Sequence, residues 1–320
     1  MTIHISVNRE DAQDSISVLK RMGMIDPSHK IYNSGERVFI PVISADTIPE
    51  SVPGTIVDLD GKPREERLRP LVQPGSFDVI GHIAIIKYIE GKDYSSKANE
   101  ILQTRKSIRT VYLDRGVKGD HRKRTLELLA GEDLPETLYR ENGITLRVNV
   151  RKAYFSPRLA TERLLISSRI RDGEYVCDMF SGIGPFSISI AKNARARVVA
   201  IDSNCDAVEI LRENISINRL VGTIDAICAD SSSEILKHGK FDRIIMNLPH
   251  DAFSFIENAY AALIDGGLIN YYEISTDEGI TDRMMQFRDM GLKLTWKRVV
   301  HGYSKMESLH SMEFQKIPRN

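Results

Sequence analysis

Two glycines separated by one residue, Gly182 and Gly184, lie between two apolar stretches in the segment VCDMFSGIGPFSI. Glycines at a strand-to-helix turn let the backbone approach a bound nucleotide closely. Asp202 ends the next apolar stretch, where a carboxylate would accept hydrogen bonds from ribose hydroxyls, and Asp230 ends the third, beside the expected adenine. We therefore predict a nucleotide-containing cofactor here. The alternative is an ordinary strand–helix turn in which the aspartates are helix caps.

The charges around this turn indicate which cofactor it binds. The complete glycine fingerprint of dinucleotide-binding proteins is missing, Asp178 stands before the turn, and Pro185 removes a backbone donor at the start of the following helix. A helix start that binds pyrophosphate needs such donors and no nearby carboxylate. S-adenosylmethionine carries a sulfonium and an ammonium group, so it suits this turn better than a phosphate.

The loop Asn247-Leu248-Pro249 follows a fourth apolar stretch, DRIIM. It resembles the Asn-Pro-Pro-Tyr type of loop in methyltransferases that modify nitrogen atoms, where the amide and a fixed backbone hold a planar nitrogen against the methyl group. At the end of a predicted strand, this loop indicates methyl transfer to nitrogen.

A parallel sheet is needed to bring these side chains together. From about residue 160, apolar strands alternate with helices; the strands are EYVCDMF, RVVAID, IDAICAD, DRIIMNLP and GLINYYEI. Such alternation predicts an α/β fold with a parallel sheet covered on both faces. We place this domain at residues 151–320.

Two smaller units precede it. The helical spacing of REDAQDSISVLKRMGMI and a hairpin in KIYNSGERVFIPVI predict an α+β module over residues 1–68. Five of the twelve prolines lie between Pro49 and Pro74, which predicts a stiff linker. Strands in FDVIGHIAIIKYI and IRTVYLD, a helix in SSKANEILQTRKSI and a hairpin turning at Glu141-Asn142-Gly143 predict a middle α+β domain over residues 74–150.

Composition narrows the function classes. The chain has 320 residues, 42% hydrophobic, with 44 basic and 44 acidic side chains, so no overall charge indicates a nucleic-acid partner. The segment from Arg105 to Arg124, however, contains eight Lys or Arg and only two Asp, and it also contains Tyr112 and His121. This stretch suits a surface that follows RNA phosphates, although a solvated basic face explains the composition equally well.

Cysteine usage and the N-terminus bear on location. Cys177, Cys205 and Cys228 are far apart and lack a CxxC spacing, so we expect neither a metal site nor a disulfide, and three thiols fit a reducing cytosol. The segment MTIHISVNREDAQD does not have the layout of a signal peptide, and no apolar run is long enough to span a membrane. We expect a cytoplasmic protein without a membrane partner.

Together, the segments YFSPRLATER, DMFSGIGPFSI, AIDSN, RIIMNLP and INYYE resemble the archaeal and eukaryotic tRNA (guanine-37 N1) methyltransferase family. The likeness extends to HRKRTLELLAG and RENGITLRVNV in the middle domain and to the N-terminal module. It implies a class I, Rossmann-like methyltransferase domain with two smaller N-terminal α+β domains. It also implies S-adenosylmethionine as donor, N1 of guanosine 37 as target, and a monomer that binds tRNA at the anticodon loop and the elbow.

The resemblance further implies roles for individual residues. The family's catalytic arginine falls on Arg122, with Arg124 as the nearest competitor, and its catalytic glutamate falls on Glu162. The residues matching positions around the donor and the target base are Tyr154, Arg158, Asp178, Asp202, Asn204, Asp230 and Asn247. Gly182 and Gly184 complete the donor site, and Pro249 belongs with Tyr154 and Arg124 on the substrate side.

These assignments fit the chemistry of the target. N1 of guanine carries a proton, so its methylation needs a base at N1 and a cation near O6, where negative charge builds up. Glu162 and Arg122 supply this pair, and Tyr154 offers a ring on which the splayed base stacks. The segment SPRLATER predicts a helix start that places Arg158 and Glu162 on one face, towards the glycine turn. The alternatives are a salt bridge between Arg158 and Glu162 and a core position for Tyr154.

Other functions share parts of this pattern. The wybutosine-pathway aminocarboxypropyl transferase modifies the same nucleotide, but its fourth-strand loop does not normally read Asn-Leu-Pro. A bifunctional methyltransferase that also acts on a tricyclic wyosine precursor remains compatible with the sequence. The acidic and amide side chains argue against an inactive RNA-binding protein, and the two N-terminal units argue against a small-molecule methyltransferase.

Overall fold

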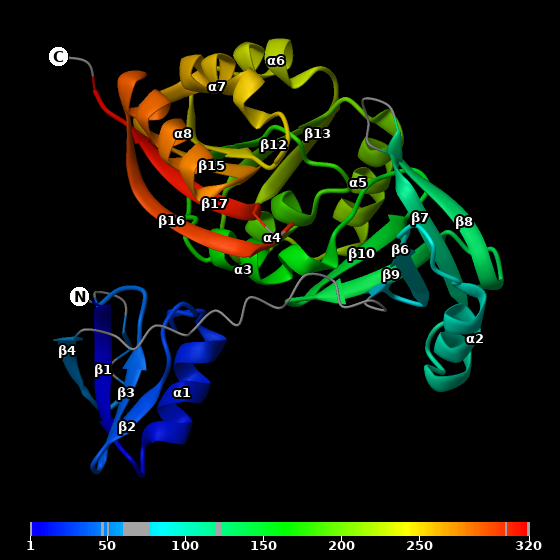
Figure 1. Ribbon diagram of the computed structural model, residues 1–320. Helices are drawn as coiled ribbons and strands as arrows, with labels where there is room; N and C mark the ends of the chain where they lie inside the picture. The colour runs from blue at the N-terminus through cyan, green and yellow to red at the C-terminus, as the bar shows by residue number, and fades with distance from the viewer. Residues whose placement is uncertain are drawn as a thin grey trace. The chain divides into compact units, whose positions relative to one another are not determined.

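The structure is a computed structural model that describes residues 2–45, 48–49, 51–59, 77–118, 123–304 and 306–318. The chain divides into two compact units, Met1–Arg67 and Leu68–Asn320, each of which is described by itself. Figure 1 shows their elements. No helix in the described ranges is both long and apolar enough to cross a membrane.

The described residues of the N-terminal unit form a four-stranded antiparallel sheet and one helix. Its elements are β1 (Thr2–Asn8), α1 (Ala12–Arg21), β2 (Tyr32–Ser34), β3 (Arg37–Pro41) and β4 (Thr55–Leu59), and the strand order is β2-β3-β1-β4. Leu19 of α1 packs against Ile5 and Ile40 of the sheet in one apolar cluster. The predicted helix and hairpin are confirmed, and Gly35 takes the left-handed conformation that the hairpin turn requires (φ +63°).

The second unit begins with a smaller sheet. Its elements are β5 (Phe77–Ile80), β6 (Ile83–Lys87), α2 (Ser95–Thr104), β7 (Thr110–Lys118) and β8 (Lys123–Gly131), with strand order β5-β6-β7-β8. Ala98 and Ile101 of α2 pack on one face of this sheet. The predicted strand pair, helix and strand are therefore confirmed.

The predicted hairpin is confirmed as β9 (Glu136–Glu141) and β10 (Ile144–Asn149), which turns at Asn142 and Gly143 with φ of 42° and 78°. It is a separate two-stranded sheet. Its residues Leu146 and Val148 share an apolar cluster with Ile183, within the glycine turn, and Leu211 of α5. Because Ile83 and Tyr112 of the smaller sheet belong to the same cluster, the hairpin joins the two larger parts of the unit.

The largest sheet has seven strands in the order β13-β12-β11-β14-β15-β17-β16. These strands are β11 (Tyr175–Asp178), β12 (Arg197–Asp202), β13 (Thr223–Cys228), β14 (Phe241–Met246), β15 (Leu263–Ser275), β16 (Leu292–Gly302) and β17 (Ser308–Lys316). The first five are parallel, as predicted. β17 is antiparallel to both of its neighbours because a short connection, not a helical crossover, joins it to β16.

Helices cover both faces of this sheet (Figure 1). The helices are α3 (Ala160–Ser167), α4 (Pro185–Asn193), α5 (Cys205–Ile217), α6 (Ser231–Glu234), α7 (Ile256–Ala262) and α8 (Asp277–Asp289), with 3₁₀ turns η1 (Pro157–Leu159), η2 (Ile235–His238) and η3 (Ala252–Phe255). Consecutive strand residues serve different faces: Val176 and Ile245 join the cluster under α3 and α4, whereas Cys177 and Ile244 join the cluster under α7 and α8. The predicted α/β, Rossmann-like fold is confirmed.

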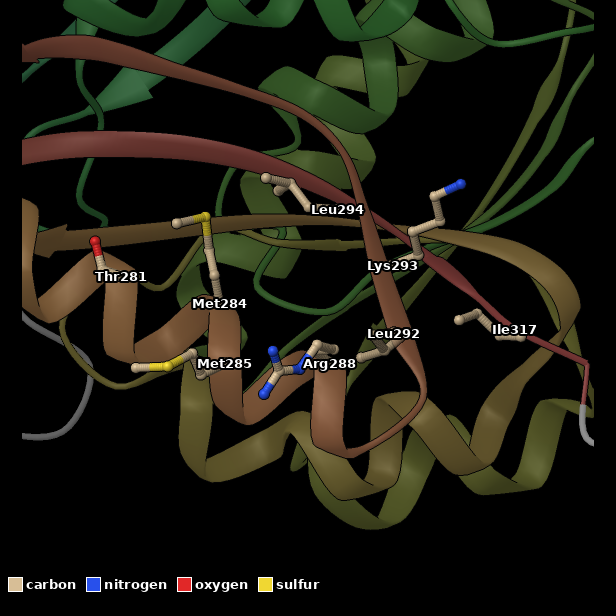
Figure 2. A pocket seen from close by; sticks show the side chains of 8 residues that line it. All are labelled: Thr281, Met284, Met285, Arg288, Leu292, Lys293, Leu294 and Ile317. Atoms are coloured by element: carbon tan, nitrogen blue, oxygen red, sulfur yellow. The ribbon is translucent and has the colours of Figure 1, made fainter.

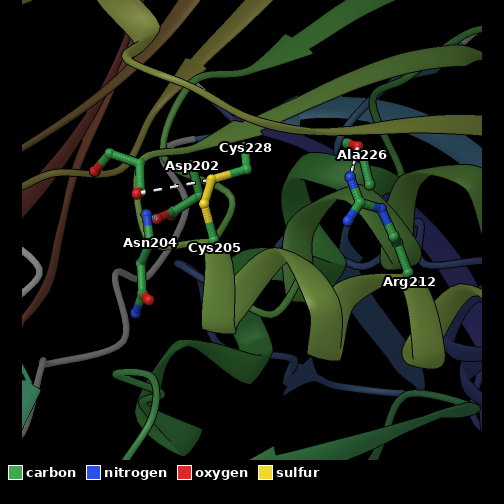
Figure 3. Close-up of a disulfide and its surroundings, with 7 residues drawn as sticks. Asp202, Asn204, Cys205, Arg212, Ala226 and Cys228 are labelled. Atoms are coloured by element: carbon green, nitrogen blue, oxygen red, sulfur yellow. Dashed lines mark hydrogen bonds between the residues drawn. A yellow bond between two sulfur atoms is a disulfide. The ribbon is translucent and has the colours of Figure 1, made fainter.

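The expectation that the cysteines form no disulfide is wrong. Cys205, the first residue of α5, and Cys228, the last residue of β13, form a disulfide (Figure 3) with Cα atoms 5.2 Å apart. Cys177 is a buried free thiol. The two cysteines meet because β12 and β13 are parallel neighbours, so the end of β13 lies beside the turn that leads from β12 into α5. The cysteines therefore no longer support a reducing compartment.

We expect the paired change Cys205→Ser and Cys228→Ser to lower the free energy of unfolding by about 3 kcal/mol, because the bond closes a loop of 23 residues. Urea unfolding of the wild type, with and without a thiol reductant, and of the double variant measures this. The reduced wild type should match the variant. Equal stability in all three samples would show that the bond contributes nothing.

Candidate active site

The glycine turn lies at the carboxyl end of β11, where the strand order reverses between β12 and β14. Such switch points are the usual ligand sites of open parallel sheets. Asp202, at the end of β12, accepts hydrogen bonds from the backbone N–H of Gly182 (2.6 Å) and of Asn204 (2.9 Å). Gly184 has φ +83°, and an added Cβ would come within 2.1 Å of the Leu211 side chain, so only glycine fits there. The fold thus brings four predicted donor-site residues together.

Asp178, the last residue of β11, is buried beside this turn. Its Oδ2 atom accepts a hydrogen bond from Ser187 Oγ (2.7 Å), which links the strand to α4. Burial raises the pKa of Asp178 to about 7, and the charge of Asp202 adds to the shift, while the Ser187 bond opposes it. The carboxyl group is therefore set to bind a cation near neutral pH.

Three buried oxygens at this edge have no hydrogen-bond partner among the residues that the structure describes: Asp178 Oδ1, Ser181 Oγ and Asn247 Oδ1. Asp178 ends β11, Ser181 lies just after it, and Asn247 follows β14, the adjacent parallel strand. Buried polar atoms without partners are rare because each costs desolvation free energy. A ligand that carries an ammonium group would satisfy such acceptors, so these residues fit S-adenosylmethionine.

The other predicted cofactor residues have protein partners. Asp230 is the N-cap of α6 and accepts a hydrogen bond from Ser232 N–H (2.7 Å). This is the alternative interpretation of the sequence, in which the aspartates cap helices. Bonds from the Ser232 side chain and backbone lower the pKa of Asp230. Arg158 pairs with Asp78 of β5 (Nη2–Oδ1, 2.8 Å). The alternative interpretation, a salt bridge between Arg158 and Glu162, is therefore wrong.

The helix start is more complex than the sequence indicated. Ser156 is an N-cap and Pro157 the first helical residue, as predicted, but of the 3₁₀ turn η1, and Ser156 makes no side-chain cap bond. α3 begins only at Ala160. Arg158 and Glu162 therefore belong to two helical segments with different partners.

Glu162 is buried between α3 and the large sheet. Its Oε1 atom accepts hydrogen bonds from Ser311 Oγ (2.6 Å) and Tyr272 Oη (3.1 Å), and Oε2 lies 3.7 Å from Arg298 Nε. Tyr272 follows Tyr271, which is the register partner of Met246, the residue before Asn247. Glu162 thus lies one strand away from the Asn247 loop.

The neighbouring Arg163 has a structural role that the sequence did not indicate. Its guanidinium donates to both carboxylate oxygens of Glu141 (2.5 and 2.6 Å) and to the Ser156 carbonyl (3.2 Å), with both charged side chains buried. Glu141 ends β9, so this pair ties the β9–β10 hairpin to α3. The only sequence signal that bears on this ion pair is the position of Glu141 at the predicted hairpin turn Glu141-Asn142-Gly143.

Tyr154 and Arg124, two residues predicted for the substrate side, contact each other. Tyr154 is 46% exposed, so its alternative as a core residue is wrong. The Arg124 guanidinium lies 4.8 Å from the Tyr154 ring centre, pairs with Asp114 (2.7 Å) and donates to the Phe155 carbonyl (3.3 Å). The smaller sheet therefore contacts the segment before η1. Arg122, the first choice for the catalytic arginine, lies outside the described residues.

Two further positions complete the edge. The Tyr154 carbonyl lies 3.9 Å from where a Cβ on Gly182 would be, which places Tyr154 beside the glycine turn. The Pro249 carbonyl accepts a hydrogen bond from Ile274 N–H (3.0 Å), so the Asn247 loop is anchored to β15.

A hollow of about 340 Å³ lies elsewhere, between α8 and β16 (Figure 2). Its lining is mainly apolar and includes Met284, Met285, Leu292, Leu294 and Ile317. None of the predicted donor or substrate residues lines it.

Comparison with known proteins places the chain among tRNA methyltransferases. The model of the TRM5/TYW2 methyltransferase domain matches residues 137–297, that of the TYW2 N-terminal domain residues 59–134, and that of the tRNA methyltransferase 5 N-terminal domain residues 5–48. The tRNA (guanine(37)-N(1))-methyltransferase Trm5b of Pyrococcus abyssi is 34% identical, with 98% of this chain and 99% of the relative covered.

Solved structures agree with this similarity. The complex of aTrm5 and tRNALeu superposes with a TM-score of 0.71 at 29% identity, with 99% of this chain and 100% of that chain covered. Trm5 of Methanocaldococcus jannaschii in complex with adenosine has a TM-score of 0.68 at 28% identity, with the same coverage.

Proposed function

Because this chain belongs to the TRM5/TYW2 methyltransferase family, we propose that it transfers the methyl group of S-adenosylmethionine to N1 of guanosine 37 in tRNA, next to the anticodon. The observation that supports this best is the meeting, at the carboxyl edge of the sheet, of an exposed tyrosine with three buried oxygens that have no hydrogen-bond partner in the described part of the chain. Asp178, Ser181 and Asn247 offer the oxygens, and Tyr154 offers the ring.

The residues divide into a donor side and a base side. S-adenosylmethionine, when bound, supplies an electrophilic methyl group on its sulfonium. Asp178 and Ser181 would bind its ammonium group, Asp202 its ribose and Asp230 the adenine edge. Tyr154 would stack on the target guanine, and the Asn247 amide would hold the base edge in the plane of the loop.

Methylation of N1 also requires removal of its proton. We assign this step to Glu162, with the guanidinium of Arg122 or Arg124 stabilising the negative charge that develops on O6. The Glu162 side chain is 0% exposed. Proton transfer therefore requires that RNA binding moves this side chain or α3 so that the carboxylate reaches the base.

Methyl transfer is favoured over aminocarboxypropyl transfer by the N-terminal unit. Residues 5–48 match the tRNA methyltransferase 5 N-terminal domain, and the similarity to Trm5b covers the full chain. We assign this unit to contacts with tRNA away from the anticodon loop. We also propose that the domain boundaries lie near residues 68, 74 and 150 and that a linker joins the first two domains.

Two labelled donors test the proposal. The protein is incubated with a tRNA transcript that has guanosine at position 37 and with S-adenosylmethionine labelled in either the methyl or the carboxyl group. Mass spectrometry of the digested RNA should show N1-methylguanosine carrying only the methyl label. Transfer of the carboxyl label, or no transfer, would contradict the proposal. A transcript with adenosine at this position is the control.

We expect Asp202→Ala to weaken S-adenosylmethionine binding by roughly 10- to 100-fold, because a charged acceptor is lost and the glycine turn loses its anchor. Calorimetry measures the affinity. Asp225→Ala removes an exposed carboxylate from the neighbouring strand β13 and is the matched control. Unchanged donor affinity in a folded Asp202 variant would remove Asp202 from the donor site.

Donor affinity should rise with pH as Asp178 ionises. Its pKa is about 7, so below that pH the carboxyl is increasingly neutral and binding of a cation should weaken by up to about tenfold per pH unit. In the absence of the donor, the stability of the fold depends on pH in the opposite direction. Because the pKa of Asp178 is raised in the folded state, this residue contributes to the free energy of unfolding. The contribution is fully present below pH 3.8, the ordinary pKa of the group, and is lost as the pH rises through about 7.

Calorimetric titrations between pH 5.5 and 7.5 measure this dependence, and adenosine is the control ligand because it lacks the cationic groups. Asp178→Asn should flatten the profile. An equally steep profile for adenosine would show that Asp178 does not contact a cation.

A further inference from the structure

A second exposed tyrosine, Tyr303, lies at the tip of the β16–β17 hairpin and is 41% exposed. Its ring contacts the His250 ring edge-on, with centroids 5.6 Å apart, and Lys87 Nζ lies 5.7 Å from its centre. His250 directly follows the Asn247-Leu248-Pro249 loop, and Lys87 ends β6. Three segments distant in sequence therefore meet around one aromatic ring.

Hydrogen bonds near the tip of the hairpin order the backbone that carries this ring. The backbone N–H groups of Tyr303 and Ser304 both donate to the Glu307 carbonyl (2.8 and 3.0 Å). Ser304 Oγ in turn accepts a hydrogen bond from the Glu307 N–H (3.1 Å). These bonds order the backbone at Tyr303, which lowers the backbone entropy lost when a ligand covers the ring.

Tyr303 and Tyr154 lie on opposite sides of the Asn247 loop in the strand order. Tyr154 contacts the turn after β11, Asn247 follows β14, and Tyr303 lies beyond β15 beside β17. The smaller sheet links the two rings. Lys87 pairs in register with Asp114, which binds the same Arg124 that stacks on Tyr154. Each exposed ring thus has a cation at its face.

An exposed ring beside a cation suits one chemical class of ligand in particular. Unpaired nucleotides present a flat base that stacks on an aromatic ring and a phosphate that a cation neutralises. Tyr88, next to Lys87, repeats the arrangement: it is 40% exposed, and the Arg115 guanidinium lies 4.9 Å from its ring centre. The surface therefore extends along the end of the smaller sheet.

We propose that Tyr303, with His250 and Lys87, is a second stacking site that binds a nucleotide adjacent to the target base in a single-stranded RNA loop. Tyr154, on the other side of Asn247, stacks on the target base itself, so the two rings would hold two neighbouring nucleotides of the RNA loop. This inference rests on the proposed function, because it assigns the RNA contacts of the same site.

A fluorescent base analogue tests the contact directly. An anticodon stem-loop RNA carries 2-aminopurine on the 5′ or the 3′ side of the target guanosine, and its fluorescence responds to stacking. Wild type and Tyr303→Phe should change the fluorescence at one of these two positions, and Tyr303→Ala should lose that change. Met306→Ala, on the same hairpin and 80% exposed, is the control and should behave as wild type.

Kinetics with the same RNA give the second readout. Tyr303→Ala should raise the KM for RNA by about 5- to 150-fold, as expected for the loss of one stacked base, with unchanged donor affinity and melting temperature. An unchanged KM together with an unchanged fluorescence response in Tyr303→Ala would overturn the inference. If the wild type binds the RNA with a Tyr303-dependent signal but methylates nothing, the stacking site stands and the proposed function fails.

Discussion

Glu162→Gln should slow methyl transfer within a single turnover by about 10²–10⁴-fold, the usual cost of losing a general base. Glutamine keeps the shape of the side chain, and its carbonyl oxygen can still accept the hydrogen bond from Ser311 Oγ. It cannot accept a proton from N1 of guanine at neutral pH. Rapid-quench measurements with saturating tRNA and donor give the rate, and binding titrations should show little change in either affinity.

Ser311→Ala separates chemistry from structure in this experiment. It removes the shortest hydrogen bond to Glu162, at 2.6 Å, but leaves the carboxylate in place. If Glu162 is the base, Ser311→Ala should retain most of the rate that Glu162→Gln loses. Equal, small losses in both variants, together with lowered melting temperatures, would give Glu162 a structural role beside Arg298 and Tyr272.

Glu141→Ala should lower the free energy of unfolding by about 3–5 kcal/mol, because it leaves the Arg163 guanidinium buried without its counter-charge. The side chains of Glu141 and Arg163 are only 4% and 1% exposed, so water cannot replace the lost partner. A loss of this size is a large part of the stability of an ordinary domain. Urea unfolding monitored by circular dichroism measures it.

Glu136→Ala is the matched control on the same hairpin. Glu136 pairs with Arg147 where both side chains are more than 40% exposed, so its loss should cost less than about 1 kcal/mol. Replacing both Glu141 and Arg163 by Met should recover much of the stability, because no charge is then left buried. If Glu141→Ala is as mild as Glu136→Ala, the buried pair does not hold the hairpin to α3.

Local sequence signals predicted the structure correctly wherever residues adjacent in the chain determine it. Asn142-Gly143 predicts its hairpin because both residues accept the left-handed backbone that a two-residue turn requires. Gly184 marks its turn for a related reason, since a Cβ there would collide with Leu211. The apolar runs of β11, β12 and β14 predict a parallel sheet because strands buried on both faces do not alternate with polar residues. These signals also place Asp178, Asp202 and Asn247 at strand ends.

Only the tertiary structure decided which residues become partners across the sheet. Glu162 finds Tyr272 and Ser311, which are 110 and 149 residues away, because β15 and β17 lie side by side above α3. Cys205 and Cys228 meet because β12 and β13 are neighbours. No local spacing encodes such pairs, since strand order is set by the packing of the whole core. Within YFSPRLATER, the sequence therefore predicted a helix start and left Tyr154 open between a stacking ring and a core position, whereas packing separated Arg158, Glu162 and Arg163 into three different environments.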